Sequence, residues 1–460
     1  MAVEVAAASW PALPALPSPA TAKVVASGLA AELAYALDGP FHFLLPDAFS
    51  ANLVAMRQAL TRAEVDGFVY YAKKANKAAV FVERAAAGGA GVDVASVPEL
   101  RESLGHGVRG EHLMVTGPAK DPALLRLAVA HGALVAVDSL DELDRLISLA
   151  LTEPARPARV LLRVLPGAQP HSRFGMSEGE LATALQRCRQ AGDRVRMEGF
   201  SFHLSGYALR PRADLAARLV DLCLAARRDG LEASRISVGG GLPVSYTDAD
   251  SWQTFLTTQR PAHYHAGKRF RTDDFYPYHS PVAGAAALRA LLATRPHNAD
   301  STLADLLREA GIGLALEPGR ALLDQAGATV LSVRGVKDRE GYQLVTVDGT
   351  SLSLSEQWFG SEFLPDPQLI PRERSAAAPA GVFPASVGAA TCLESDMLTW
   401  RKVSFPHPPR VGDLLLYPNT AGYQMDSNES SFHDLPLPPK VVVDRTDRPR
   451  PRWRLDRHFT

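Results

Sequence analysis

Two adjacent lysines, Lys73 and Lys74, offer reactive chemistry at a defined place in the chain. They follow a β-prone run at 68–72 and precede a helix-like segment. Side chains alternate between the two faces of a strand, so both amines cannot point into the same pocket. An amine held in a pocket at the end of a strand is a nucleophile for carbonyl groups. The alternative is a solvated basic pair, and the rest of the sequence decides between the two.

Eight short β-prone runs recur along the chain, and a helical pattern follows each of them. The runs begin at residues 67, 91, 113, 134, 160, 200, 236 and 314. Helix-start signals of the form Ser-x-x-Glu, in which two side chains cap the first turn, begin at Ser96, Ser139 and Ser177. Eight alternating units favour a closed parallel (β/α)8 TIM barrel, and an open doubly wound sheet is the alternative.

The pattern changes after residue 322, where β-prone runs follow one another without clear helices. Runs at 328–334, 342–347 and 413–417, with a tight turn at Asp348-Gly349, predict antiparallel strands. The fold class is therefore α/β plus all-β, a barrel followed by a C-terminal antiparallel β-barrel domain. The expected segments are an N-terminal extension (1–37), a strand completing the β domain (38–50), the barrel (51–322) with an aromatic insertion (245–298), the β domain (323–445) and a basic tail (446–460).

Composition and charge exclude several classes of function. Lys and Arg number 49 against 50 Asp and Glu, so no basic footprint for nucleic acid is expected. The three cysteines, and the histidines at 263, 265 and 279, lack the spacing and partners of a metal site. The Ala/Pro-rich start lacks the features of a signal peptide, and no apolar run is long enough to span a membrane. We expect a cytoplasmic protein that acts on a small molecule.

Polar residues fall at the ends of the predicted barrel strands, where (β/α)8 barrels carry their reactive groups. Asp93 lies in the second strand, Arg163 ends the fifth and His203 ends the sixth. Three glycines at 239–241 follow the seventh strand, and Glu-Pro-Gly-Arg at 317–320 follows the eighth. Glycines let a backbone approach a phosphate, and an arginine supplies charge. Together with a lysine, and a carboxylate that keeps a pyridine nitrogen protonated, they indicate pyridoxal 5'-phosphate (PLP).

Each of these residues has a less specific explanation when it is taken alone. His203 would more often be a hydrogen-bonded core histidine, and Cys392 an inert buried thiol. The glycines at 239–241 are also compatible with a bare turn, and 317–320 with a surface turn. Asp93 is less ambiguous, because a carboxylate in an apolar strand needs a partner and a lysine supplies one.

Taken in order, the motifs resemble the fold-type-III PLP-dependent decarboxylases, the diaminopimelate and ornithine decarboxylase group with its alanine-racemase-type barrel. The likeness runs from about residue 38 to 445, and the ordered set is more specific than any single motif. The matching motifs are Tyr71-Ala-x-Lys74-Ala-Asn76, Gly91-x-Asp93-x-Ala-Ser96, Thr116-Gly-Pro-x-Lys120, Phe174-Gly175, His203, Gly239-Gly-Gly241, Glu317-Pro-Gly-Arg320, Cys392-x-x-x-Asp396 and Gly422-Tyr423.

The resemblance implies a role for each matched residue. Lys74, the fourth residue of Tyr-Ala-x-Lys, would form the Schiff base with PLP, and Asp93 would contact its amine. His203 would stack on the pyridine ring and Glu317 would pair with its nitrogen, while Arg163 would order the site beneath the ring. The residues implied to hold the phosphate are Ser205, Gly239, Gly240, Gly241, Gly319, Arg320 and Tyr423.

The resemblance also implies a head-to-tail homodimer with active sites shared across the interface. Cys392 would enter the partner subunit's site as the proton donor, and Asp396 would enter it near the distal end of the substrate. Glu394 and Tyr423 complete the expected substrate-binding set. No metal, nucleic acid or membrane is implied.

Three departures from the family pattern leave the substrate open. Ser205 precedes a glycine where the family has Gly then Ser, so either Ser205 or the glycine N–H would bond the phosphate. Glu394 is displaced from the position of the glutamate that reads the distal ammonium in diaminopimelate enzymes, and Ser431-Phe-His433 stands where Phe-Asn-Gly is common. We therefore predict a PLP-dependent decarboxylase of an L-amino acid of the diaminopimelate, ornithine or lysine class. An amino-acid racemase and a catalytically silent PLP-fold regulator are the alternatives.

Overall fold

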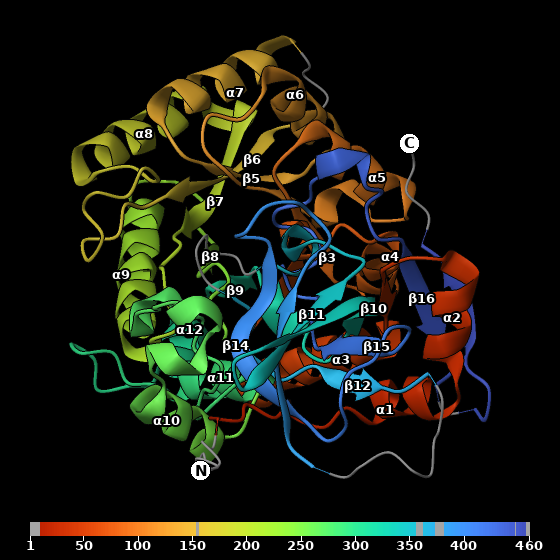
Figure 1. Ribbon diagram of the computed structural model, residues 1–460. Coiled ribbons are helices and arrows are strands. Elements are labelled where there is room, and N and C mark those ends of the chain that lie inside the picture. The colour runs from red at the N-terminus through yellow and green to blue at the C-terminus, as the bar shows by residue number, and fades with distance from the viewer. Residues whose placement is uncertain (1–9, 153–155, 356–361, 373–380, 447, 457–460) are drawn as a thin grey trace. The chain divides into compact units, whose positions relative to one another are not determined.

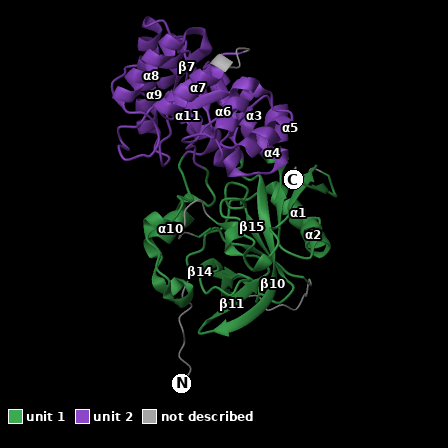
Figure 2. Cartoon of the chain, turned by 90° about the horizontal axis from the view of Figure 1, so that it is seen from above, with its two compact units in different colours: residues 1–48, 244–281, 323–456 green, residues 49–243, 282–322, 457–460 purple. Residues whose placement is uncertain are grey.

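The computed structural model describes residues 10–152, 156–355, 362–372, 381–446 and 448–456 (Figure 1). The chain forms two compact units, which are coloured separately in Figure 2. We call them the barrel unit, built from Phe49–Pro243 and Val282–Leu322, and the sheet unit, built from Met1–Ala48, Val244–Pro281 and Leu323–Asp456. Each is described by itself.

Eight parallel strands close into a barrel, as the alternating sequence pattern predicts. The closure is made by β2 and β9, where Gly67 pairs with Leu314. The open doubly wound sheet is thereby excluded. In chain order the barrel strands are β2 (Gly67–Ala72), β3 (Gly91–Val94), β4 (Leu113–Val115), β5 (Leu134–Val137), β6 (Ala158–Arg163), β7 (Val195–Ser201), β8 (Arg235–Ser237) and β9 (Gly313–Leu316).

Helices follow the strands in the sequence and surround them in space (Figure 1). They are α3 (Pro46–Arg62), α4 (Ala79–Ala87), α5 (Val97–Gly105), α6 (Pro122–His131), α7 (Leu140–Thr152), α8 (Glu178–Ala191), α9 (Leu209–Arg228), α11 (Gly284–Ala293) and α12 (Leu303–Ala310). The predicted N-caps at Ser96 and Ser177 are confirmed, since each side chain accepts the N–H of the glutamate three residues later.

The capping box predicted at Ser139 is wrong, because Glu142 has another partner. Its carboxylate is fully buried, accepts a hydrogen bond from Lys120 Nζ at 2.9 Å, and accepts the N–H of Asp138. A buried lysine needs a buried counter-charge, so the tertiary pair takes the glutamate that a local cap would have used.

An apolar layer fills the middle of the barrel and separates its two ends. The buried members are Tyr70, Met114, Leu134, Ala136, Leu161 and Ala315, with Phe68 packed against them. Gly91 makes room for the largest of these side chains, since a Cβ there would lie 2.6 Å from the Tyr70 ring. The barrel is therefore a packed core with two separate polar ends.

Among its described residues, the sheet unit holds nine strands in one mostly antiparallel sheet, which confirms the predicted all-β class of this region. The order is β14-β13-β11-β10-β1-β16-β17, and β15 pairs with both β10 and β12. The strands are β1 (Phe41–Leu44), β10 (Gly327–Arg339), β11 (Tyr342–Val347), β12 (Gln368–Ile370), β13 (Phe383–Gly388), β14 (Met397–Phe405), β15 (Leu414–Pro418), β16 (Lys440–Asp444) and β17 (Arg452–Leu455).

The N-terminal part of the chain contributes to the core of this sheet. Strand β1 lies between β10 and β16, antiparallel to the first and parallel to the second. Helices α1 (Pro19–Ala26) and α2 (Leu29–Leu37) bury Val24, Leu29 and Leu33 in the same apolar cluster as Phe41 and Phe43. No single described helix is long and apolar enough to cross a membrane, and α1 with α2 pass that test only together, as a pair bent by 67°.

Two expectations about the organisation of the chain need correction. Residues 452–455 of the expected basic tail form β17, which pairs antiparallel with β16. The prolines at 449 and 451 lie before this strand. The expected insertion at 245–298 is divided, since Val244–Pro281 belongs to the sheet unit and α11 belongs to the barrel unit. Tyr246 and Tyr278 of this segment make ring contacts with Phe363, so its aromatic residues pack in the sheet unit.

Candidate functional site

The two lysines at the end of β2 have different surroundings. They lie in a short 3₁₀ turn, Lys73–Ala75, directly after the strand. The Lys73 side chain is buried and its Nζ lies 2.7 Å from a carboxylate oxygen of Glu102. The Lys74 side chain is half-exposed, and its Nζ lies 3.8 Å from a carboxylate oxygen of Asp93. Lys74 therefore has the reachable amine at the carboxyl ends of the strands, while Lys73 is held in a buried ion pair.

Asp93 is a buried acid on β3 with two partners. It accepts a hydrogen bond from Thr116 Oγ1 at 2.7 Å and faces Lys74. Burial raises the pKa of its carboxyl group to about 7, although Lys74 and the Thr116 hydrogen bond oppose the shift. A carboxyl group that titrates near neutrality beside an amine can exchange a proton with it.

The glycines after β8 form a turn that other residues would not fit. Gly239 and Gly241 have φ values of 67° and 75°, in the left-handed region that favours glycine. A Cβ at Gly239 would lie 2.8 Å from His203 Nδ1, and one at Gly241 would lie 2.2 Å from an Arg212 nitrogen. The turn brings bare backbone close to the His203 and Arg212 side chains, and a phosphate cradle likewise needs backbone without side chains.

Arg212, on α9, holds this turn from behind. Its guanidinium is buried and donates hydrogen bonds to the carbonyl oxygens of Val238 at 2.9 Å and of Leu204 and Gly206 at 3.3 and 3.1 Å. One side chain thus connects the loops that follow β7 and β8. The sequence carries a signal for it, because Arg212 shares the helical spacing of the buried Ala216 and other core positions of α9.

Glu317 is oriented by the ends of two strands. Ser237 Oγ donates to its Oε1 at 2.5 Å, and the N–H of Gly239 donates in turn to Ser237 Oγ at 3.2 Å. The N–H of Glu317 donates to the carbonyl oxygen of Gly239 at 2.9 Å. Within the part of the chain that the structure describes, no residue donates to Oε2, so this oxygen can receive a protonated ring nitrogen. Ser237 was not predicted, although it stands two residues before the glycine run.

The remaining expected barrel residues lie around the same opening. Arg163 ends β6, pairs with Asp138 at 3.2 Å and stacks its guanidinium over Phe174. His203 follows β7 and is open to solvent on one side; burial of its ring, with the positive charges of Lys74 and two arginines, lowers its pKa, so that it is neutral at pH 7. Ser205 is exposed in the loop after β7, and Arg320 is buried in the turn after β9.

These barrel residues fit PLP on structural grounds. They offer a reachable amine, a carboxylate oxygen with room for a ring nitrogen, and a glycine turn near a buried arginine. When bound, PLP withdraws electrons from the carbon next to the substrate carboxyl group.

The other expected site residues belong to the sheet unit and lie around the loop between β13 and β14. Cys392 and Glu394 are exposed there. Cys392 Sγ lies 3.2 Å from His433 Nε2, a contact that places a thiol beside an acid–base group. Asp396 is buried and accepts the N–H of Ser351 at 2.8 Å and the hydroxyl of Thr391 at 2.6 Å, so its carboxylate shapes the loop that carries Cys392.

Tyr423, also in the sheet unit, has a φ of 77°. A bulky residue seldom adopts this left-handed conformation, and such strain is concentrated at functional sites.

Comparison with known proteins connects most of the chain to one group. Residues 47–274 match the family described as "Pyridoxal-dependent decarboxylase, pyridoxal binding domain". The chain is 40% identical over 413 residues to the uncharacterized protein y4yA of Sinorhizobium fredii, with 89% of each chain covered. It is 27% identical over 433 residues to a diaminopimelate decarboxylase of Actinosynnema pretiosum, with 90% of this chain and 86% of that protein covered.

Solved structures share the fold. Diaminopimelate decarboxylase from Helicobacter pylori, complexed with L-lysine, matches with a TM-score of 0.69 and 17% identity, covering 91% of this chain and 93% of that one. Lysine/ornithine decarboxylase from Vibrio vulnificus, complexed with putrescine, matches with a TM-score of 0.67 and 20% identity, covering 91% and 98%.

Proposed function

The chain belongs to the pyridoxal-dependent decarboxylases and is a PLP-dependent carboxy-lyase, and we propose that its substrate is an L-amino acid whose side chain ends in an amine. Diaminopimelate, ornithine and lysine are the members of this class that we propose to test. The observation that carries the PLP chemistry is the reachable Lys74 amine beside the buried Asp93 carboxyl group at the carboxyl ends of the barrel strands. The choice of a distal amine is supported by the similarity to a diaminopimelate decarboxylase.

We propose that Lys74 is the residue that binds the aldehyde of PLP. Asp93, with a pKa raised to about 7, would take a proton from the amine or return one near neutral pH. Glu317 would hold the ring nitrogen protonated, and the neutral His203 would lie against the ring. Gly239–Gly241 and Arg320 would hold the phosphate.

We propose that Cys392 returns a proton to the substrate carbon after CO2 leaves. The contact with His433 supports this role, because an imidazole 3.2 Å from the sulfur can protonate the thiolate again after each turnover. The exposed Glu394 would attract the distal ammonium of the substrate. The enzyme would be a homodimer in which Cys392 serves the partner subunit's site, as the resemblance implies.

The substrate class is tested on the purified protein with PLP added. L-Lysine, L-ornithine and meso-diaminopimelate are supplied separately, CO2 release is measured, and the amine product is identified by mass. One of the three should be decarboxylated much faster than L-leucine, which lacks the distal amine. Equal rates with L-leucine would contradict the proposed class.

The attachment point is tested by borohydride reduction followed by peptide mass analysis. The label is expected on Lys74, and the adjacent Lys73 is a built-in control because its amine is buried against Glu102. A label on Lys73, or an unlabelled peptide from protein that retains bound PLP, would refute the assignment.

The shared site is tested by mixing two inactive variants, Lys74→Ala and Cys392→Ala. If each site combines Lys74 of one subunit with Cys392 of the other, random exchange restores about a quarter of the wild-type sites. Restored CO2 release supports the shared dimer. If refolded mixtures stay inactive while each variant still forms dimers, Cys392 does not act in the partner's site.

A further inference from the structure

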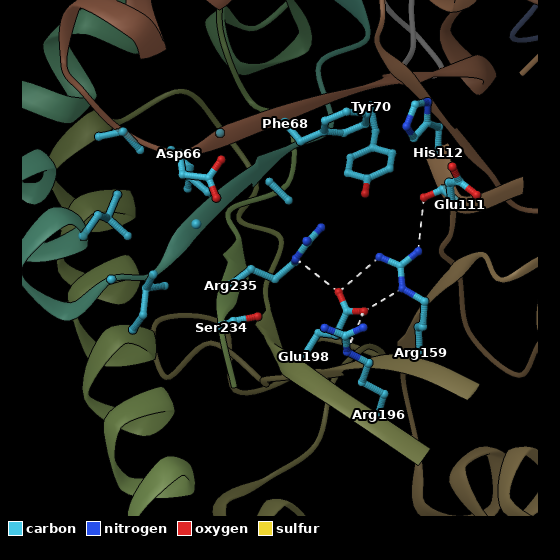
Figure 3. A pocket seen from close by; sticks show the side chains of 18 of the residues that line it. Asp66, Phe68, Tyr70, Glu111, His112, Arg159, Arg196, Glu198, Ser234 and Arg235 are labelled. Atoms are coloured by element: carbon cyan, nitrogen blue, oxygen red, sulfur yellow. Dashed lines mark hydrogen bonds and ion pairs between the residues drawn. The ribbon is translucent and has the colours of Figure 1, made fainter. Parts of the chain in front are cut away.

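A large cavity, drawn in Figure 3, opens at the amino ends of the barrel strands. Lys74 follows the carboxyl end of β2, at the opposite end of the barrel. Its volume is about 920 Å³, within the range of sites for small ligands. Residues at or near the starts of β2, β4, β6, β7, β8 and β9 line it. The apolar layer around Met114 and Leu161 lies between this cavity and the PLP end.

Three arginines meet one buried acid in this cavity. Glu198, on β7, is 2% exposed. Arg159 Nε lies 2.6 Å from its Oε1, Arg235 Nε lies 3.2 Å from its Oε2, and Arg196 Nε lies 3.7 Å from its Oε1. Arg196 also pairs with Glu232 at 2.6 Å, at the surface. The single negative charge of Glu198 balances the charge of Arg159, and Glu232 balances that of Arg196. The positive charge of Arg235 is therefore in excess.

The hydrogen bonds distinguish the arginines further. Arg159 also donates to the carbonyl oxygens of Glu111 and Gly132, so its guanidinium is fully engaged. Arg235 and Glu198 form an ion pair whose atoms are not aligned for a hydrogen bond. Arg235 Nε is therefore buried with no hydrogen-bond partner among the described residues. The two terminal nitrogens of Arg235 make no hydrogen bond with any described residue, and they lie on the cavity side of the group (Figure 3).

Tyr70 supplies a second unused donor. Its side chain is 1% exposed, yet its hydroxyl points into the space beside Arg235 and Arg159 (Figure 3). Across the described residues of the barrel unit, none makes a hydrogen bond with this hydroxyl. Burial raises the pKa of the phenol while the two arginines oppose the shift, so the hydroxyl keeps its proton at neutral pH. A buried hydroxyl without a partner is costly unless a ligand or solvent accepts from it.

The cavity also has an apolar wall and an acidic rim. The Phe68 ring lies 4.9 Å from the Tyr70 ring and 5.1 Å from the His112 ring, measured between centroids. Asp66 and Glu111 are exposed acids of the lining and would repel a second negative charge.

We propose that this cavity binds a small organic anion with a single carboxylate or phosphate head group. The head group would accept hydrogen bonds from Tyr70 and Arg235, and an apolar or aromatic part would lie against Phe68 and His112. Charge-assisted hydrogen bonds from a guanidinium and a neighbouring hydroxyl suit an oxyanion. The proposal is independent of the substrate of the decarboxylase, because none of these residues belongs to the Lys74 end.

Calorimetric titration of the full-length PLP-bound enzyme tests it with two probes. Benzoate carries the carboxylate and phenyl phosphate carries the phosphate, so the two arms show which head group the site takes. At least one probe should bind at one site per chain. Tyr70→Phe removes only the hydroxyl and should weaken that binding about fivefold to tenfold. Arg235→Gln should weaken it more, since a charged donor is lost.

Arg196→Gln is the matched control, because it makes the same charge change beside the same glutamate but removes a side chain already paired with Glu232. It should leave binding within about twofold of wild type. The proposal is wrong if neither probe binds, or if Tyr70→Phe binds as wild type does. Tyr70→Phe decides the question even if Arg235→Gln fails to fold, since phenylalanine keeps the buried ring.

Discussion

The two ends of the barrel each carry polar side chains from the same strands, but their buried acids have different partners. β6 carries Arg159 near its start and Arg163 at its end, and β8 carries Arg235 at its start and Ser237 at its end. Residues two apart on a strand share a face, so each strand offers polar side chains to both ends of one interior. The apolar layer around Leu161 lies between them.

The two ends differ in the hydrogen-bond and ion-pair partners of their buried acids. At the carboxyl ends, Asp93 has Thr116 and Glu317 has Ser237, each a neutral hydroxyl, and Lys74 is the cation beside Asp93. At the amino ends, one acid faces three permanently charged guanidinium groups (Figure 3). Burial raises the pKa of Asp93 to about 7, against the opposing effect of Lys74 and the Thr116 hydrogen bond, so this carboxyl group suits proton transfer near neutral pH. Arginines keep their charge at every working pH, which suits the binding of an anion.

The largest expected effect is a difference in CO2 release between variants at the two ends of the barrel. Lys74→Ala should lower CO2 release by at least about a thousandfold, because the nucleophilic amine is lost. Arg235→Gln, at the other end, should leave CO2 release within about twofold of wild type. Steady-state rates at saturating PLP measure both. A large loss in Arg235→Gln with a normal melting curve would show that the ends are coupled.

Glu198→Gln, at the amino ends of the strands, should lower the stability of the protein without changing its activity. Removing the buried acid leaves Arg159 without its counter-charge, so the free energy of unfolding should fall by about 3 kcal/mol. Denaturant unfolding measures the change, and the rate per folded enzyme should be unaffected. Glu232→Gln, at the exposed partner of Arg196, is the control and should cost less than about 1 kcal/mol. Equal losses of unfolding free energy in the two variants would show that burial does not make the Glu198 ion pair more important than the exposed one.

Ser237→Ala should reveal how Glu317 is oriented. Without the hydroxyl, Glu317 and the N–H of Gly239 both lose a partner, and PLP should dissociate about tenfold more readily. Absorbance titration with PLP measures the dissociation constant. Ser234→Ala changes a serine beside the other end of the same strand and should leave the constant unchanged. If the two variants bind PLP equally well, Ser237 does not orient the Glu317 carboxylate toward the cofactor.

Asp93→Asn should change how the stability of the PLP-free protein depends on pH. The folded pKa of Asp93 is raised from 3.8 to about 7, so the folded state binds a proton more tightly than the unfolded state. Its contribution to stability is present below about pH 4 and is lost as pH rises toward 7, at no more than about 1.4 kcal/mol per pH unit. Asp93→Asn should therefore show a shallower decline over this window in urea unfolding. An unchanged slope would mean that Asp93 titrates normally.

Local pattern predicts much of this molecule. The alternation of β-prone and helical segments gives the eight-stranded barrel, and the serines at 96 and 177 mark the starts of helices. The lysine pair at 73–74, Asp93 and the glycines at 239–241 stand in or after barrel strands, where a barrel gathers reactive groups. These features depend on neighbours in the sequence, so they can be read without the tertiary structure.

The tertiary structure decided whatever depends on partners far apart in the sequence. Glu142 pairs with Lys120 instead of capping its helix, and β17 becomes a strand because β16 offers it an edge. Arg212 connects two loops that meet only in the folded barrel. No sequence motif marks the cavity beside Tyr70 and Arg235, because these two donors lie 165 residues apart in the chain, on different strands. Propensity and spacing are local properties, whereas the pairing of buried charges is settled only when the strands close.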